Sequence, residues 1–286
     1  MPPLSDRLRI VTPASLTELL AVLNANPHSF IYSGGTYIMG KHRGVRFPRL
    51  PETIVALDRI DELKRITRSE RHFDIGSAAS ITSILEVGGK VVPTALSDAL
   101  RTIGYRPIRN LATLGGNVCV PDARVTAFPV LLLLDAQLEL KRTSRSRWVS
   151  LSRFVHADGN LNLQPGEVCT RIRIPRGEWN VQEYRNTQSY PRASSWGMSF
   201  CGVANTQKGS LSDLRFAFGS MGKTIIRNRE IEAELIGRKL PLGARDVDAA
   251  ARQLELSLES ITPALNSFQR RTTLRYFSWF LETLPD

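Results

Sequence analysis

The sequence predicts an α+β fold with two tightly packed parts. The chain has 286 residues, of which 42% are hydrophobic and 23% are charged, and this composition suits a globular protein with a sizeable core. Short strands and helices alternate up to about residue 165, whereas a run of strands and then a run of helices follow it. Segregation of this kind is typical of an α+β arrangement. No repeat, low-complexity tract or long linker interrupts the chain.

The N-terminal residues predict a strand at 8–11, followed by a helix with a clear apolar face. Two N-caps are available for this helix: Thr12, with Pro13 at the first helical position, or Ser15, with Glu18 three residues later. Asn26-Pro27 is expected to end the helix. The residues expected on its buried face are Leu16, Leu19, Leu20 and Leu23.

The remaining elements follow from periodicity and turn residues. A hairpin is expected from residues 64–66 and 73–75. Further strands are expected at 30–32, 53–57, 137–141, 147–149, 168–174, 182–186, 199–204 and 214–218. Helices are expected at 81–86, 94–102, 125–134, 230–235, 247–258 and 265–284.

The charge balance favours a basic surface without a nucleic-acid signature. Net charge is +11, from 38 Lys+Arg against 27 Asp+Glu. The arginines are scattered, and there is neither a basic arm nor a recognition-helix pattern. A solvated surface that attracts acidic partners or phosphate-bearing cofactors is the better interpretation. A basic nucleic-acid-binding protein is the alternative from another class, and steep salt dependence of DNA or RNA binding would support it.

Cysteine and histidine spacing predicts no metal site within this chain. No C-x-x-C pair and no H-E-x-x-H arrangement occurs. Metal chemistry, if present, is expected on another chain. The cysteines are Cys119, Cys169 and Cys201, and the histidines are His28, His42, His72 and His156.

No segment predicts a membrane span. The longest apolar run, Val130–Leu134, is far too short to cross a bilayer. The first residues lack the apolar core of a secretory signal. A cytoplasmic location is therefore expected.

Two glycine-rich segments carry the chemistry. The first glycine segment, Ser33–Thr36, and the second glycine segment, Thr113–Asn117, each follow an apolar stretch and are expected to form turns. Glycine serves where the backbone needs a positive φ or must approach a ligand closely. Successive exposed N–H groups on such a turn suit a pyrophosphate. Neither segment fits G-x-G-x-x-G or G-x-x-x-x-G-K-[ST], which argues against Rossmann and P-loop sites.

The surrounding residues resemble the flavoprotein family of the molybdenum hydroxylases, which includes xanthine dehydrogenase and carbon monoxide dehydrogenase types. Residues 31–38, I-Y-S-G-G-T-Y-I, are similar to its G-G-T-[DE]-[LI] loop. Residues 108–118, I-R-N-L-A-T-L-G-G-N-V, match its I-R-N-x-A-T-[IL]-G-G-N-[IV] segment almost letter for letter. Shorter matches follow in order: Ile75–Ala78 to I-G-A-x, Pro129–Ala136 to P-x-L-L-x-L-x-A, Gly166-Glu167 with Ile172–Pro175 to G-E…I-x-I-P, and Arg192-Ala193 before a strand.

The resemblance implies an FAD-binding domain at 1–175 and a C-terminal α+β domain at 176–286, a β-meander with helices. The first domain would be a cradle of two α/β subdomains, as in the vanillyl-alcohol-oxidase type, with their boundary near residue 55 and the pyrophosphate held by both glycine segments. Cys169 falls where the family makes a backbone contact near the flavin. The residues expected to line FAD are Ile31, Tyr32, Ser33, Gly34, Gly35, Thr36, Tyr37, Ile38, Thr113, Leu114, Gly115, Gly116, Asn117 and Cys169.

The resemblance also implies a role in electron transfer. FAD would take electrons singly from an iron–sulfur cluster on a partner and deliver them in pairs to NAD⁺ or another acceptor. The expected partners are a large molybdopterin-binding subunit and a small two-iron ferredoxin-like subunit. Substrate choice would lie with the large subunit.

Three positions depart from the family pattern. Tyr37 replaces the usual acidic residue, Thr126 stands where an aspartate is usual although Asp122 is nearby, and Gln188 takes the place of a basic residue beside the flavin. These changes leave a flavin-free scaffold subunit as one alternative. A second is a stand-alone FAD oxidoreductase of the vanillyl-alcohol-oxidase type, although only His42 lies near a glycine segment as a candidate histidine tether.

Overall fold

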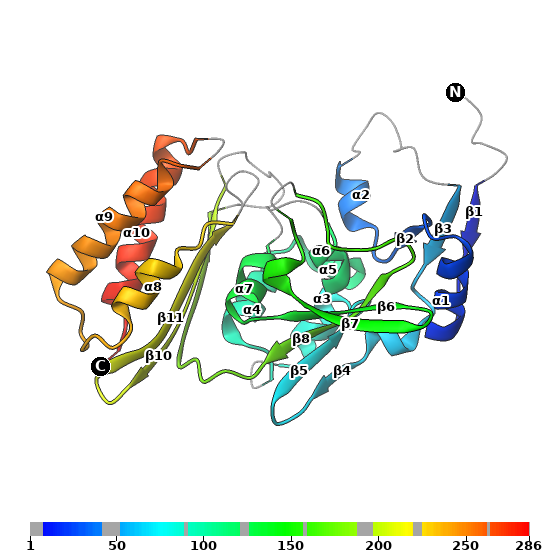
Figure 1. The fold of residues 1–286 in the computed structure, drawn as a ribbon, viewed down its shortest axis with the longest axis horizontal. Helices are drawn as coiled ribbons and strands as arrows, with labels where there is room; N and C mark the ends of the chain where they lie inside the picture. The colour runs from blue at the N-terminus through cyan, green and yellow to red at the C-terminus, as the bar shows by residue number, and fades with distance from the viewer. Residues whose placement is uncertain are drawn as a thin grey trace. The chain divides into compact units, whose positions relative to one another are not determined.

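The computed structural model describes residues 8–41, 52–88, 91–120, 126–156, 159–187, 197–219, 225–261 and 264–285 (Figure 1). The chain forms two compact units, each assembled from separate stretches of sequence. Unit 1 comprises Met1–Val91, Tyr105–Pro121 and Asp135–Arg176, and unit 2 comprises Val92–Gly104, Asp122–Leu134 and Gly177–Asp286.

Unit 1 contains two sheets. β1 and β2 both pair in parallel with β3, and the second sheet has the antiparallel order β4-β5-β8-β6-β7. The elements of unit 1 are β1 (Arg9–Val11), α1 (Leu16–Ala25), β2 (Phe30–Tyr32), α2 (Thr36–Lys41), β3 (Thr53–Ala56), the 3-10 helix η1 (Asp61–Lys64), β4 (Ile66–Arg68), β5 (His72–Gly76), α3 (Ile81–Glu86), α5 (Arg106–Leu111), α6 (Leu114–Val118), β6 (Gln137–Arg142), β7 (Arg145–Ser150), the 3-10 helix η2 (Leu151–Arg153) and β8 (Val168–Pro175).

The α1 helix shows which of the two available caps is used. The Ser15 hydroxyl accepts from the Glu18 N–H at 3.2 Å, and the Glu18 carboxylate accepts from the Ala14 N–H at 2.8 Å. The Thr12 cap is therefore wrong and the Ser15 cap is confirmed. Leu19 and Leu23 on the inner face are buried together with Val55 of β3 and Val168 of β8, so one core joins both sheets of unit 1.

Three short helices of unit 1, α2, α5 and α6, differ from the sequence-based expectation. The first glycine segment continues directly into α2, and the second begins α6, so the second segment is helical where a turn was expected. Glycines weaken a helix interior, which hid α6 from propensity arguments. Thr113 offsets this cost because its side chain caps α6 by accepting from the Gly116 N–H at 3.1 Å.

Unit 2 is a three-stranded antiparallel meander with helices on both faces. The sheet order is β11-β10-β9, as expected for consecutive strands. Its elements are α4 (Thr94–Arg101), α7 (Phe128–Leu133), β9 (Val181–Asn186), β10 (Ser199–Gln207), β11 (Ser210–Gly219), α8 (Arg229–Leu235), α9 (Ala244–Leu258) and α10 (Ser267–Glu282).

The helices α8, α9 and α10 cover one face of this meander (Figure 1). Phe280 of α10 packs on Gly202 of β10, and the rings of Phe216 and Phe277 have centroids 4.5 Å apart. The opposite face receives α4 and α7. Arg215 of β11 donates to the Leu133 carbonyl at 2.8 Å. The α7 helix is shorter than the expected 125–134.

None of the helices within the described residues combines the length and the apolar character that crossing a membrane requires.

Candidate functional site

Unit 1 brings the two glycine segments into direct contact. The Ser33 and Thr113 hydroxyl oxygens lie 3.1 Å apart. A Cβ atom added to Gly34 would lie 1.8 Å from the Leu111 carbonyl oxygen, so the two backbones touch where no side chain fits. The sequence predicts that both segments serve one ligand, and the structure places them side by side.

The first glycine segment offers unused hydrogen-bond donors. Gly35 has φ +66°, a left-handed conformation that favours glycine. Within the described residues, the N–H groups of Gly34, Gly35 and Thr36 donate to no acceptor. The Gly35 carbonyl, in contrast, accepts from the Met39 N–H at 3.1 Å. Three consecutive free N–H groups suit an anionic ligand such as a pyrophosphate.

The second glycine segment has already used its backbone donors. The Gly115 N–H donates to the Ser77 carbonyl at 2.8 Å, and the Asn117 N–H donates to the Thr113 carbonyl at 2.9 Å. The Leu114 N–H donates to the Ala79 carbonyl at 3.2 Å. The expectation of an exposed N–H nest at this segment is therefore wrong. The Leu114 and Gly115 N–H groups hold α6 against the residues that follow β5, and the Asn117 N–H is used within α6.

Two buried polar atoms at the second glycine segment lack partners. The Ser77 hydroxyl and the Asn117 side-chain oxygen are fully buried, and neither has a hydrogen-bond partner within the described part of the chain. Buried polar atoms are normally satisfied, so each one without a partner needs an explanation. A polar cofactor or an ordered water at this place would satisfy both. The unused donors of the first segment and these two atoms fit a group with many oxygens and nitrogens, as FAD has.

Sequence reasoning missed Ser77. The matching family motif is I-G-A-x, and Ser77 stands where that motif has alanine. The replacement of the motif's alanine by serine, which adds a hydroxyl, was the signal in the sequence that could have identified Ser77. A Cβ atom added to Gly115 would lie 2.6 Å from the Ser77 Cβ, which places this residue directly against the second glycine segment.

Cys169 lies on β8 beside this segment. A bulge in the β6–β8 pairing leaves Thr170 without an opposite residue on β6, and the Thr170 carbonyl accepts from the Ser77 N–H at 3.0 Å. Contact with the Cys119 thiol, together with burial, raises the pKa of Cys169 well above its ordinary value. The Cys169 side chain is therefore a neutral thiol, which is a poor nucleophile.

The other residues predicted to line the site occupy different environments. Ile31 packs against the core of α1, which leaves its backbone for any ligand contact. Tyr37 lies on α2 with 37% of its surface exposed, and Ile38 is half-buried. Thr126 belongs to unit 2. The positions outside the described residues are His42, Asp122, Gln188 and Arg192-Ala193.

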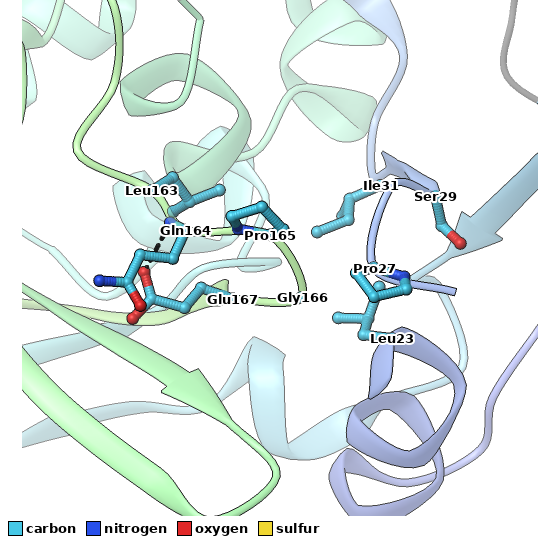
Figure 2. Close-up of a pocket in the computed structure, with 9 residues that line it drawn as sticks. All are labelled: Leu23, Pro27, Ser29, Ile31, Leu163, Gln164, Pro165, Gly166 and Glu167. Atoms are coloured by element: carbon cyan, nitrogen blue, oxygen red, sulfur yellow. Dashed lines mark hydrogen bonds between the residues drawn. The ribbon is translucent and has the colours of Figure 1, made fainter. Parts of the chain in front are cut away.

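A separate cavity of about 230 Å³ lies between the α1–β2 connection and residues 163–167 (Figure 2). The Gly166 N–H donates to the Pro27 carbonyl at 3.0 Å and closes one side. Glu167 accepts two hydrogen bonds of 2.8 Å from Arg147 and another of 2.8 Å from the Gln164 N–H. The lining residues are Leu23, Pro27, Ser29, Ile31, Leu163, Gln164, Pro165, Gly166 and Glu167.

The charge of Glu167 argues against a phosphate in this cavity. Burial raises the pKa of Glu167, but the hydrogen bonds from Arg147 and the Gln164 N–H outweigh it and hold the pKa below its ordinary value. The carboxylate is therefore ionised and already paired. A pyrophosphate fits the glycine segments better than it fits this cavity.

Across the described residues, no cluster of three or more histidine, cysteine, aspartate or glutamate side chains could hold a metal ion.

Comparison with known proteins agrees with this geometry. A family described as the FAD-binding domain in molybdopterin dehydrogenase matches residues 6–177, more than half of the chain. The putative xanthine dehydrogenase FAD-binding subunit of Escherichia coli is 27% identical over 260 residues, covering 87% of this chain and 85% of the relative. Aldehyde oxidase 2 of Cavia porcellus is 28% identical over 301 residues and 98% of this chain. The chain spans only 22% of that oxidase's length.

The fold is similar to that of a solved carbon monoxide dehydrogenase chain from Hydrogenophaga pseudoflava. The TM-score is 0.80 at 20% identity, and the match covers 96% of this chain and 95% of the other. At this level of identity the likeness supports the α+β fold.

Proposed function

Because the chain belongs to the family of FAD-binding domains of molybdopterin dehydrogenases, we propose that it is the electron-transfer flavoprotein of a molybdenum hydroxylase. The contact between the two glycine segments carries this proposal: it brings the segment with three unused N–H donors against the segment where two buried polar atoms lack partners. The proposed limits are residues 1–175 for the FAD-binding part and 176–286 for the C-terminal domain.

The residues of this chain bind and orient the cofactor. The N–H groups of Gly34, Gly35 and Thr36 would donate to its phosphate oxygens. The contact between Ser33 and Thr113 fixes the spacing of the two segments. Asn117 would offer its buried side-chain oxygen to a donor on the cofactor. The first segment follows β2, and hydrogen bonds to Ser77 and Ala79 hold the second segment beside the end of β5. One core joins the sheets of β2 and β5, so these groups are held in place before the ligand arrives.

Bound FAD would supply the step between one-electron and two-electron carriers. The electrons would come from iron–sulfur clusters on partner chains and leave to NAD⁺ or another acceptor. The partners would be a molybdopterin-binding large subunit and a two-iron ferredoxin-like small subunit, working with this chain in the cytoplasm.

The acceptor is tested by anaerobic reduction of the FAD-loaded chain with NADH. Bleaching of the flavin absorption by NADH supports NAD as the acceptor. Bleaching by dithionite but not by NADH would assign another acceptor. The electron-transfer role itself is tested by purification under gentle conditions, where recovery of the chain without either partner would contradict the proposed complex. A folded chain that takes up no FAD would instead favour the flavin-free scaffold.

A further inference from the structure

Tyr32 is one of the residues that the family resemblance predicts to line FAD, and its side chain carries a phenol hydroxyl. Side chains alternate across a strand, so Ile31, which packs on the α1 core, and Tyr32 point to opposite faces of β2. Tyr32 belongs to neither of the two hydrophobic clusters described above, and its side chain is half-buried. The Tyr32 ring therefore packs in neither of these two cores.

The ring of Tyr32 lies over Gly35. A Cβ atom added to Gly35 would lie 2.1 Å from the Tyr32 hydroxyl oxygen and 2.4 Å from the ring carbon that bears it. The hydroxyl thus stands beside the turn whose N–H groups at Gly34, Gly35 and Thr36 are unused. Within the described residues the hydroxyl itself makes no hydrogen bond.

Resting on the proposed FAD function, we propose that the Tyr32 hydroxyl is a fourth donor to the cofactor's pyrophosphate. A tyrosine O–H donates readily, and hydrogen bonds to charged acceptors are stronger than neutral ones. Three N–H groups and one hydroxyl on the same short turn would recognise phosphate oxygens rather than the flavin ring. Tyr32 is thus a binding residue for the phosphate end of the ligand.

The test measures dissociation constants of FAD, ADP and riboflavin for the wild-type chain and for Tyr32→Phe. ADP carries the pyrophosphate without a flavin, and riboflavin carries the flavin without a phosphate. We expect Tyr32→Phe to weaken the binding of FAD and of ADP by about tenfold, which equals ~1.4 kcal/mol. The affinity for riboflavin should stay unchanged. Tyr276→Phe on α10, in unit 2, makes the same chemical change away from the turn and is expected to bind all three ligands like the wild type.

Two results would overturn the proposed role of Tyr32, and a third would refute the proposed FAD function. Equal binding of FAD and ADP by Tyr32→Phe and the wild type overturns it while the proposed function stands. Weaker binding of riboflavin with unchanged binding of ADP moves the hydroxyl to the flavin end and also overturns it. A wild-type chain that binds neither FAD nor ADP refutes the proposed function itself. The ratio of ADP to riboflavin affinity within one variant does not depend on the folded fraction, so a loss of stability cannot mimic the expected result.

Discussion

Replacing Gly34 by alanine tests whether the contact of the two glycine segments forms the site. The new Cβ atom would lie 1.8 Å from the Leu111 carbonyl oxygen, whereas ordinary contact begins at 3.4 Å. The backbones must therefore separate by about 1.6 Å, which is 3.4 Å less 1.8 Å. Because the obstacle is backbone on both sides, no rotamer change relieves it. Overpacking of this kind costs about 1–3 kcal/mol of stability.

The same separation removes the spacing on which ligand binding depends. It breaks the 3.1 Å contact of Ser33 with Thr113 and moves the free N–H donors of the first segment away from the second segment. A hydrogen bond to a charged acceptor contributes ~1.5–3 kcal/mol, so the loss of one such bond weakens FAD binding by at least about tenfold.

The assay is an FAD titration followed by flavin fluorescence, together with denaturant unfolding of the apoprotein. Gly40→Ala is the matched control, because Gly40 lies on α2 and an added Cβ atom there meets nothing within 4 Å. Its affinity for FAD should equal that of the wild type. If Gly34→Ala binds FAD as tightly as Gly40→Ala does, the close contact has no role in binding and the reasoning fails.

Three further predictions concern stability. Ser77→Ala should raise the stability of the apoprotein by about 1 kcal/mol, because it removes a buried hydroxyl without a partner; a loss of stability in denaturant unfolding would show that the hydroxyl is satisfied. The pKa of Glu167 is lowered in the folded chain. Its ion pair with Arg147 therefore stabilises the fold fully at pH values above the ordinary pKa of 4.5, and this stabilisation is lost as the pH falls through the folded pKa. Glu167→Gln should therefore flatten the acid limb of stability against pH, and an unchanged limb would argue against this origin. Gly202→Ala should cost about 1–3 kcal/mol in a melting experiment, because its Cβ atom would meet the buried Phe280 ring at 2.7 Å; an unchanged melting temperature would contradict the packing of α10.

Periodicity and caps predicted most of the fold. The apolar spacing of α1 and the strands of unit 2 were evident because burial follows the same repeats in sequence and space. The position of the α1 cap was less evident, since Thr12 and Ser15 both have the chemistry for it. Only the structure shows that Ser15 accepts the N–H bond from Glu18. The glycines of α6 predict a turn because they argue against a helix. The Thr113 cap stabilises α6 through one hydrogen bond that helix propensity does not include.

The candidate site was only partly predictable. Both glycine segments were identified from residue type and resemblance, but their contact joins residues far apart in the chain and depends on the packing of two sheets. For the same reason the sequence could not show that Gly115 donates to Ser77, which uses a donor that had been expected for the ligand. The resemblance includes Tyr32 among the FAD-lining residues, but the position of its hydroxyl over Gly35 depends on the fold and could not be predicted from the sequence.

Whether the chain binds FAD is shown by the absorption spectrum of the purified chain after FAD is added and unbound FAD is removed by desalting. We expect flavin bands to remain at close to one FAD per chain. A folded chain that is colourless after this treatment would contradict this expectation, because the free N–H groups of the first glycine segment and the buried atoms of the second would then serve no flavin.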